Sequence, residues 1–168
     1  MQKAGKPQGR GWRNAVFFLI ASVVVAADQF SKSWIRQHIP EGHSIPETGF
    51  FQLTHVHNTG AAFGLFHGQW FPLTVVALVG IAALLTYTLC IHRWFPFLDT
   101  MLAKSTLGLV LGGTAGNLID RLTTDIHYVT DFISIGIWPA FNIADSAITV
   151  GIIIFAYSLC TLARAGKQ

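Results

Sequence analysis

Charged side chains are scarce in this chain of 168 residues. Lys, Arg, Asp and Glu make up 11% of the sequence, whereas soluble globular domains carry about 25%. Hydrophobic residues account for 52%, which excludes intrinsic disorder. The net charge of +3 comes from scattered residues, which excludes a basic groove for nucleic acid. A chain with so little charge is expected to have the lipid bilayer as its solvent.

Cysteine is nearly absent as well. Cys90 and Cys160 each lie in an apolar run, so they form no disulfide framework and are interpreted as small apolar packing residues. The sequence contains neither a CxxC nor an HExxH pattern. We therefore expect no metal site and no cofactor.

Two long apolar runs, 71–91 and 146–163, contain no charged residue and are long enough to cross a bilayer as helices. Two shorter runs, 15–27 and 105–119, reach that length only if the helix continues through the charged residues beside them. The chain is then a single membrane-embedded domain, 1–168, with four transmembrane helices. Their expected ranges are 14–35, 70–92, 100–121 and 139–164, with Pro139 in the first turn of the last.

The extended helices carry polar side chains to membrane depth. Asp28 and Lys32 fall in the first helix, Asp120 at the end of the third, and Asp145 one to two turns inside the fourth. Polar groups are costly there, so they are functional candidates. An alternative for the first run is a cleaved signal peptide ending near Ala27. The three spans that follow favour an uncleaved helix.

Charge placement predicts the orientation. With a cytoplasmic N-terminus, eight of the 11 basic residues fall on the inner side, together with a single acidic residue, Asp99. The other seven acidic residues fall outside or at outer helix ends. This bias follows the positive-inside rule, so we expect both termini in the cytoplasm and any chemistry on the outer side.

The outer loop, 37–69, is expected to be rich in β-structure. Residues 50–57 combine aromatic and β-branched side chains, which favours a strand. Asn58, Thr59 and Gly60 indicate a turn, and 62–66 is a candidate return strand. We expect a small sheet at the membrane surface.

The third helix carries Gly108, Gly112 and Gly116, a spacing that lets a neighbouring helix approach closely. Asn117 and Asp120 lie three positions apart and share a helix face near its outer end. A structural ion pair of Asp120, with Arg121 or with Lys32, is the alternative to a functional role.

Asp131 and Asp145 bracket one short segment at the outer surface, with apolar neighbours around both. Asn142 and Asp145 share a helix face. Two carboxyl groups in a poorly solvated site cannot both ionise easily, so the pair holds one proton and offers a general acid beside a general base. Such a pair can hydrolyse a peptide bond without a metal.

Other interpretations are open at this point. Ser31 or Ser33 with Lys32 could form a Ser–Lys hydrolase, although adjacent helical residues point about 100° apart. His55 and His57 share a strand face but are too few for a metal site. Intramembrane acids could also serve a proton path in a small transporter or channel, or the chain could be a structural membrane protein.

Five short blocks resemble the bacterial lipoprotein signal peptidases (signal peptidase II), a family of aspartyl proteases. In the family's order they are 28–32, 58–64, 112–121, 129–132 and 141–146. The resemblance implies an α-helical integral membrane protein with four transmembrane helices and a small extracytoplasmic β-cradle. It implies removal of signal peptides from prolipoproteins at the outer surface of the bacterial inner membrane, just before a cysteine that already carries diacylglycerol.

The resemblance also implies residue roles. The catalytic pair is Asp131 and Asp145. Site support and substrate binding fall to Asp28, Lys32, Asn58, Gly60, Asn117, Asp120, Arg121 and Asn142. Among these, Asn117 and Asn142 orient the substrate or the pair, and Arg121 contacts the substrate backbone. The expected partners are the lipidated prolipoprotein and membrane lipids, with no nucleic acid, and the expected state is a monomer.

One departure concerns the segment between the two catalytic aspartates. Asp131 and Asp145 are 14 positions apart, fewer than is usual in the family, which implies a shortened lid-like segment at 133–138.

Overall fold

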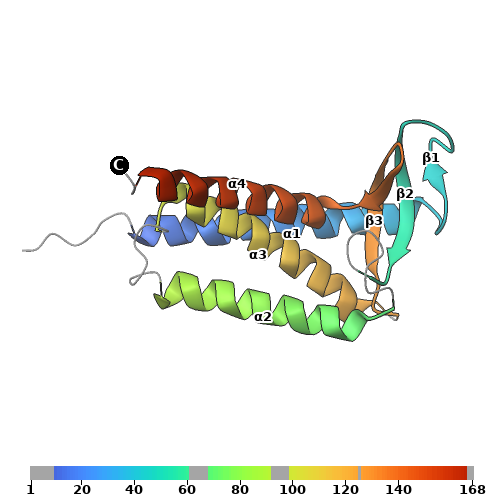
Figure 1. Ribbon diagram of the computed structural model, residues 1–168. Coiled ribbons are helices and arrows are strands. Elements are labelled where there is room, and N and C mark those ends of the chain that lie inside the picture. Colours follow the sequence, from blue (N-terminus) through green and yellow to red (C-terminus); the bar gives the residue numbers. More distant parts are fainter. Residues whose placement is uncertain (1–9, 61–67, 92–98, 125, 166–168) are drawn as a thin grey trace, which may run out of the picture.

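The computed structural model describes residues 10–60, 68–91, 99–124 and 126–165. Within these ranges it contains four long helices and a four-stranded antiparallel sheet at one end of them (Figure 1). In chain order the elements are α1 (Arg10–His38), β1 (Ser44–Ile45), β2 (Phe51–Asn58), α2 (Trp70–Leu89), α3 (Met101–Thr123), β3 (Val129–Ile135), β4 (Trp138–Phe141) and α4 (Ile143–Ala165).

Helix α3 packs against both α1 and α4, while α2 packs mainly against α3. A Cβ atom built on Gly108 would lie 2.7 Å from the carbonyl oxygen of Phe17, and one on Gly112 would lie 2.7 Å from that of Ala21. On another face, Gly113 lies against the carbonyl oxygen of Ala144 in α4. The glycine spacing predicted close packing of α3, and the structure confirms it.

Among the described helices, three are long and apolar enough to cross a membrane: Gly11–His38, Trp70–Leu89 and Ile143–Thr161. Helix α3 is not one of them, because glycine, threonine and the charged residues Lys104, Asp120 and Arg121 dilute its apolar side chains. The fold is therefore mostly helical, with three candidate spans and a small antiparallel sheet.

The strand order is β1-β2-β3-β4, and each neighbouring pair is antiparallel. Strand β2 confirms the strand expected within the outer loop. The expected return strand, 62–66, lies outside the described residues. The long partner of β2 is β3, which follows α3 and places Val56 opposite Asp131 and Asn58 opposite Val129.

The start of the last helix was predicted wrongly. Helix α4 begins at Ile143, and Pro139 lies in strand β4. Because β4 is an edge strand, the missing N–H of proline is tolerated there. Asp145 consequently lies in the first turn of α4 rather than deeper. The segment 133–138 comprises the end of β3, a turn and the start of β4.

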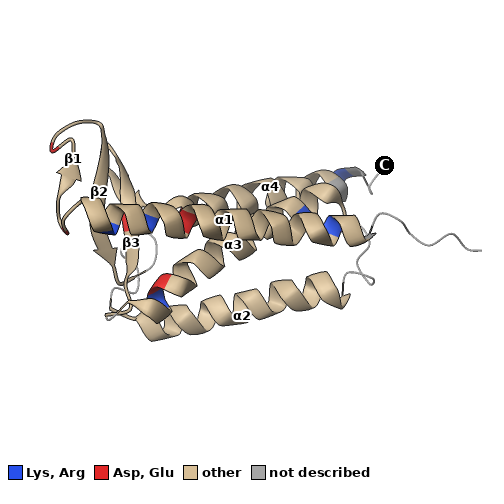
Figure 2. Cartoon of the chain, turned by 180° about the vertical axis from the view of Figure 1, so that it is seen from behind, with Lys and Arg blue, Asp and Glu red and all other residues tan. Residues whose placement is uncertain are grey.

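A small apolar cluster fixes the sheet to the helix ends. Ile35, Ile39 and Phe132 are buried together and pack against Leu53 and Ile143. Figure 2 shows acidic positions at the sheet end of the helices and basic positions at both ends. The last residues of α4 lie at the end opposite the sheet (Figure 1).

Candidate active site

Asp131 and Asp145 face one cleft at the junction of helices and sheet. Asp131 lies on β3 and is 2% exposed, and Asp145 is half-buried in α4. The cleft has a volume of about 900 Å³, and its walls come from β2, α2, α3, β3, β4 and α4. The structure thus brings together the two carboxyl groups that the sequence singled out.

Each carboxylate accepts two hydrogen bonds. Oδ1 of Asp131 accepts from Nδ2 of Asn142 at 2.7 Å, and Oδ2 accepts from Nδ2 of Asn58 at 2.8 Å. Oδ1 of Asp145 accepts from Nδ2 of Asn117 at 2.8 Å, and Oδ2 accepts from the backbone N–H of Asn142 at 3.3 Å. Amide side chains from β2, α3 and the start of α4 therefore hold the pair in place.

The local sequence explains the position of Asp145. Asn142 immediately precedes α4, and its Oδ1 accepts the backbone N–H of Asp145 at 2.9 Å. Because Asp145 accepts the N–H of Asn142 in return, the two residues form a capping box, which starts a helix at a fixed residue. A carboxylate in the first turn is also favoured by the helix dipole.

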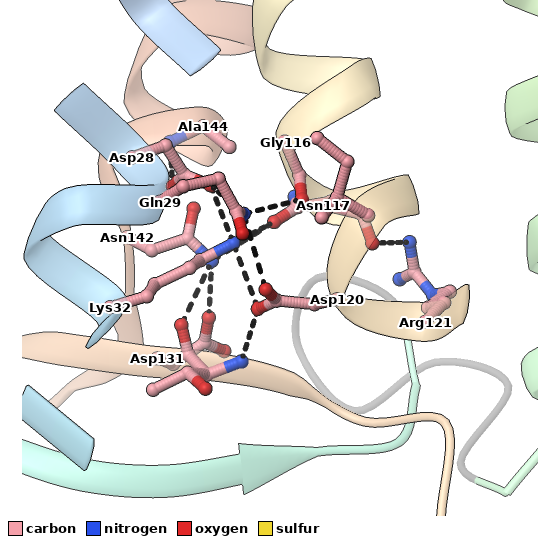
Figure 3. Close-up of polar contacts among 12 residues, drawn as sticks. Asp28, Gln29, Lys32, Gly116, Asn117, Asp120, Arg121, Asp131, Asn142 and Ala144 are labelled. Carbon is pink, nitrogen blue, oxygen red and sulfur yellow. Dashed lines mark hydrogen bonds and ion pairs between the residues drawn. The ribbon is translucent and has the colours of Figure 1, made fainter. Parts of the chain in front are cut away.

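A buried charge cluster of Asp28, Lys32 and Asp120 lies beside Asp131 (Figure 3). Nζ of Lys32 lies 2.8 Å from Asp28 and 3.1 Å from Asp120, and all three side chains are at most 1% exposed. Asp28 accepts the backbone N–H of Ala144 at 3.0 Å, and Asp120 accepts that of Thr130 at 3.0 Å. The cluster ties α1 and α3 to the segments that carry the two aspartates.

Lys32 also orients Asn117. Its ammonium donates to Oδ1 of Asn117 at 2.9 Å, and Nδ2 of Asn142 donates to the same oxygen at 3.2 Å. With its oxygen held by two donors, the amide must present its NH₂ group to Asp145. Lys32 is thus engaged with carboxylates and an amide, not with a serine, while the Ser31 hydroxyl donates to the carbonyl oxygen of Asp28. This geometry removes the Ser–Lys alternative.

The remaining predicted site residues also line or border the cleft. Nη2 of Arg121 donates to the carbonyl oxygen of Gly60 at 3.2 Å, and both residues line the cleft. The backbone N–H of Gly60 donates to Oδ1 of Asn58 at 2.9 Å, which turns the Asn58 NH₂ group toward Asp131.

Sequence reasoning missed Arg36 and Thr130. Nη1 of Arg36 donates to Oγ1 of Thr130 at 2.9 Å and lies 3.5 Å from Asp120. The available signal was helical spacing, because Arg36 follows Lys32 by four positions and shares its face.

His55 and His57 contact each other, with 3.2 Å between their Nε2 atoms. Among the described residues, no group of three or more His, Cys, Asp or Glu side chains could hold a metal ion.

Burial, and after it the charge of Asp145, raise the pKa of Asp131 to about 7, against the hydrogen bonds from Asn58 and Asn142 and the charge of Lys32. Near neutral pH the pair therefore holds one proton. One carboxylate can accept a proton from water while the other carboxyl group donates one. This is the chemistry of an aspartic protease, here at the end of a bundle of apolar helices.

Comparisons with known proteins agree with that class. The sequence model of the family described as "Signal peptidase (SPase) II" matches residues 20–161. A lipoprotein signal peptidase of Dehalococcoides mccartyi is 46% identical over 92% of this chain and 94% of that protein. A lipoprotein signal peptidase of Moorella thermoacetica is 44% identical over 90% of this chain and 96% of that protein. A solved bacterial membrane enzyme is similar with a TM-score of 0.76 and 30% identity over 88% of both chains. The chain belongs to the signal peptidase II family of aspartic endopeptidases.

Proposed function

We propose that this protein removes signal peptides from diacylglyceryl-modified prolipoproteins, with Asp131 and Asp145 as its catalytic pair. The observation that carries this assignment is the convergence of both carboxyl groups on one cleft, each held by asparagine amides. Family membership supports the reaction. The bond cleaved is the one before the lipidated cysteine.

The mechanism follows from the shared proton. The ionised carboxylate takes a proton from a water molecule in the cleft as that water attacks the peptide carbonyl. The protonated carboxyl group donates its proton to the carbonyl oxygen, which gives a tetrahedral intermediate with two hydroxyl groups. The carboxyl group that took the proton from water then donates it to the leaving amine as the C–N bond breaks, and a hydroxyl of the intermediate returns a proton to the other carboxylate. Asp145 lies in the first turn of α4, where the helix dipole partly offsets the cost of a buried negative charge.

The cleft suits a substrate that is part peptide and part lipid. Its helical walls are apolar, with Ala77 from α2 and Ile148 and Val150 from α4. Its polar groups gather at the sheet end, where Arg121 and Asn58 line the cleft within reach of a peptide backbone. The acyl chains and the signal peptide then stay in the bilayer while the scissile bond reaches the aspartates.

We further propose that all four helices cross the bacterial inner membrane in a monomer, with both termini in the cytoplasm and the sheet outside. Helix α3 is 23 residues long, which at about 1.5 Å per residue matches the apolar thickness of a bilayer. Packing against α1 and α4 shelters its polar face. The surplus of basic over acidic residues in the segments that this topology places in the cytoplasm supports the orientation.

Cleavage of paired substrates tests the function. The purified protein should release a product beginning with diacylglyceryl-cysteine, as identified by mass spectrometry, and should cut the unlipidated precursor poorly. Equal cleavage of both precursors would contradict the proposed substrate.

Cysteine labelling tests the orientation. Glu47→Cys should react with an impermeant maleimide in intact cells and Arg164→Cys should not, each in a chain without the native cysteines. Reaction at residue 164 alone would reverse the proposed topology.

A further inference from the structure

One wall of the cleft carries an imidazole that the hydrolytic mechanism does not use. His57 lines the cleft and immediately precedes Asn58. Its ring stacks on Tyr128, with 3.5 Å between ring centroids. Its Nδ1 lies 2.8 Å from Oε1 of Glu41, and its Nε2 lies 3.2 Å from Nε2 of His55. His55 in turn places Nδ1 2.7 Å from the carbonyl oxygen of Ile39.

The acceptors at the two ends of this row of contacts, the Ile39 carbonyl oxygen and the Glu41 carboxylate, determine how many protons the two imidazole rings carry. A carbonyl oxygen and a carboxylate only accept, so His55 and His57 must each donate from Nδ1. The contact between the two Nε2 atoms needs one further N–H. With all three hydrogen bonds made, the two imidazole rings carry three N–H protons, one more than two neutral imidazoles carry. The histidine pair binds one extra proton when all three hydrogen bonds are made.

The groups facing His57 determine when that proton is held. Among the described residues they are Arg36 from α1, Glu41 after α1, His55 on β2 and Tyr128 before β3. Burial lowers the pKa of His57 below its ordinary value, Glu41 acts in the opposite direction, and His55 and Arg36 lower it again. The extra proton is thus bound as the medium becomes mildly acidic. It changes the charge of the group formed by Glu41, His55 and His57 from −1 to zero.

The position of His57 within the cleft indicates which part of a substrate it meets. The apolar walls run along α2 and α4, where a signal peptide would lie, whereas His57 and Thr59 belong to the sheet end. The chain that follows the lipidated cysteine extends out of the bilayer and must pass that end of the cleft. A substrate bound in this direction would place the residues that follow the lipidated cysteine beside His57.

We infer that His57, with Glu41 and His55, is a specificity-determining element that selects substrates by the charge of the residues following the cysteine. When the histidine pair binds its extra proton, kcat/KM rises for substrates with an acidic residue at this position relative to substrates with a basic one. This inference rests on the proposed function and adds a selection that depends on pH.

A competition experiment tests it. Two diacylglyceryl precursors, identical except for Asp or Lys directly after the cysteine, are mixed and cleaved by the full-length protein between about pH 7.5 and about pH 5. The ratio of their kcat/KM values cancels the titration of the catalytic pair. Lowering the pH should raise the Asp-to-Lys ratio by up to about sevenfold, because one unit charge about 7 Å away in a solvated site changes kcat/KM about 2.7-fold for each substrate, in opposite directions.

Substitutions test whether His57 and Glu41 cause the pH dependence of the Asp-to-Lys ratio. His57→Gln should flatten the ratio against pH, and His57→Lys should keep it high and flat, because lysine holds its charge throughout this range. Glu41→Gln should raise the ratio at the upper end of the range. His43→Gln is the matched control, because His43 is exposed and does not line the cleft; it should behave as the wild type.

A ratio independent of pH in the wild type, or a pH-dependent ratio that persists in both His57 variants, would overturn the inference while leaving the proposed function intact. Failure of the proposed function is distinguishable, because then neither lipidated precursor would be cut at any pH.

Discussion

Asn142 and Asp145 cap each other at the start of α4, with 2.9 Å from the Asp145 backbone N–H to Oδ1 of Asn142 and 3.3 Å for the reverse contact. The same Asn142 side chain donates to Asp131 at 2.7 Å. A single asparagine therefore starts the helix and links both carboxyl groups. The hydrogen bonds of Asn142 that begin the helix therefore also fix the positions of the two carboxyl groups.

Replacing this residue should separate a stability effect from a catalytic one. Asn142→Ala removes the cap, at a cost of about 1 kcal/mol, and also frees Asp131, so kcat should fall by at least about tenfold. Thr100→Ala is the matched control, because Thr100 caps α3 in the same way, far from the cleft. It should lower the thermal midpoint similarly and leave kcat unchanged. Equal kcat losses in both variants would contradict a role for Asn142 in orienting the pair.

The pH dependence of cleavage should follow the raised pKa of Asp131. Above about pH 7 both carboxyl groups ionise and the general acid is lost, so kcat/KM should decline. The hydrogen bond from Asn58 lowers the pKa of Asp131, so Asn58→Ala should move this alkaline limb to higher pH. A limb that stays in place or moves to lower pH would contradict the assignment.

The same pKa has a consequence for stability. The folded protein retains the Asp131 proton between the ordinary value of 3.8 and about 7, where the unfolded chain has lost it. The contribution of Asp131 to the free energy of unfolding therefore falls as the pH rises through this window.

Removal of the buried ammonium should destabilise the protein strongly. Lys32→Met leaves Asp28 and Asp120 buried without their shared cation, and an unpaired buried charge costs about 3–5 kcal/mol. We expect a large drop in the thermal midpoint, partly restored by adding Asp28→Asn. Gln37→Ala, on the exposed side of the same helix, is the control and should have little effect. A Lys32→Met protein as stable as the wild type would refute the proposed support role.

The glycine contacts of α3 give a matched pair of substitutions. A Cβ atom on Gly112 would lie 2.7 Å from both the Ala21 carbonyl oxygen and Cβ of Val24, so Gly112→Ala must push α1 away. Gly80 in α2 has open space around it, so Gly80→Ala should be neutral or stabilise the helix by up to about 1 kcal/mol. Thermal midpoints of the two variants check this. Equal stability would show that α1 and α3 do not need their close approach.

Much of the site could be predicted because its residues lie on helices at fixed spacings. Asp28 and Lys32 are one turn apart, and Asn117 and Asp120 share a face, so helical periodicity places each pair without knowledge of the fold. The glycine spacing of α3 likewise predicted a tight interface. The motif resemblance then assigned Asp131 and Asp145 to one site.

The sheet was harder to predict because its pairing is not local. Strand β2 pairs with β3, more than 70 residues later in the chain, whereas sequence reasoning favoured a return strand directly after the turn at 58–60. Pro139 indicated a helix start, but its position in an edge strand satisfies the same backbone requirement. His55 and His57 share a face of β2, as an alternating strand predicts, but the burial of His55 depends on the non-local packing of the sheet.

The measurement that tests the account most directly is cleavage of a diacylglyceryl prolipoprotein by Asp131→Asn and Asp145→Asn. Asparagine keeps the shape and removes the titratable group, so each variant should lose about 10²- to 10⁴-fold in kcat/KM and still accumulate in membranes. Glu47→Gln, an exposed acidic position outside the cleft, should cleave like the wild type. Wild-type activity in either aspartate variant would contradict the catalytic pair.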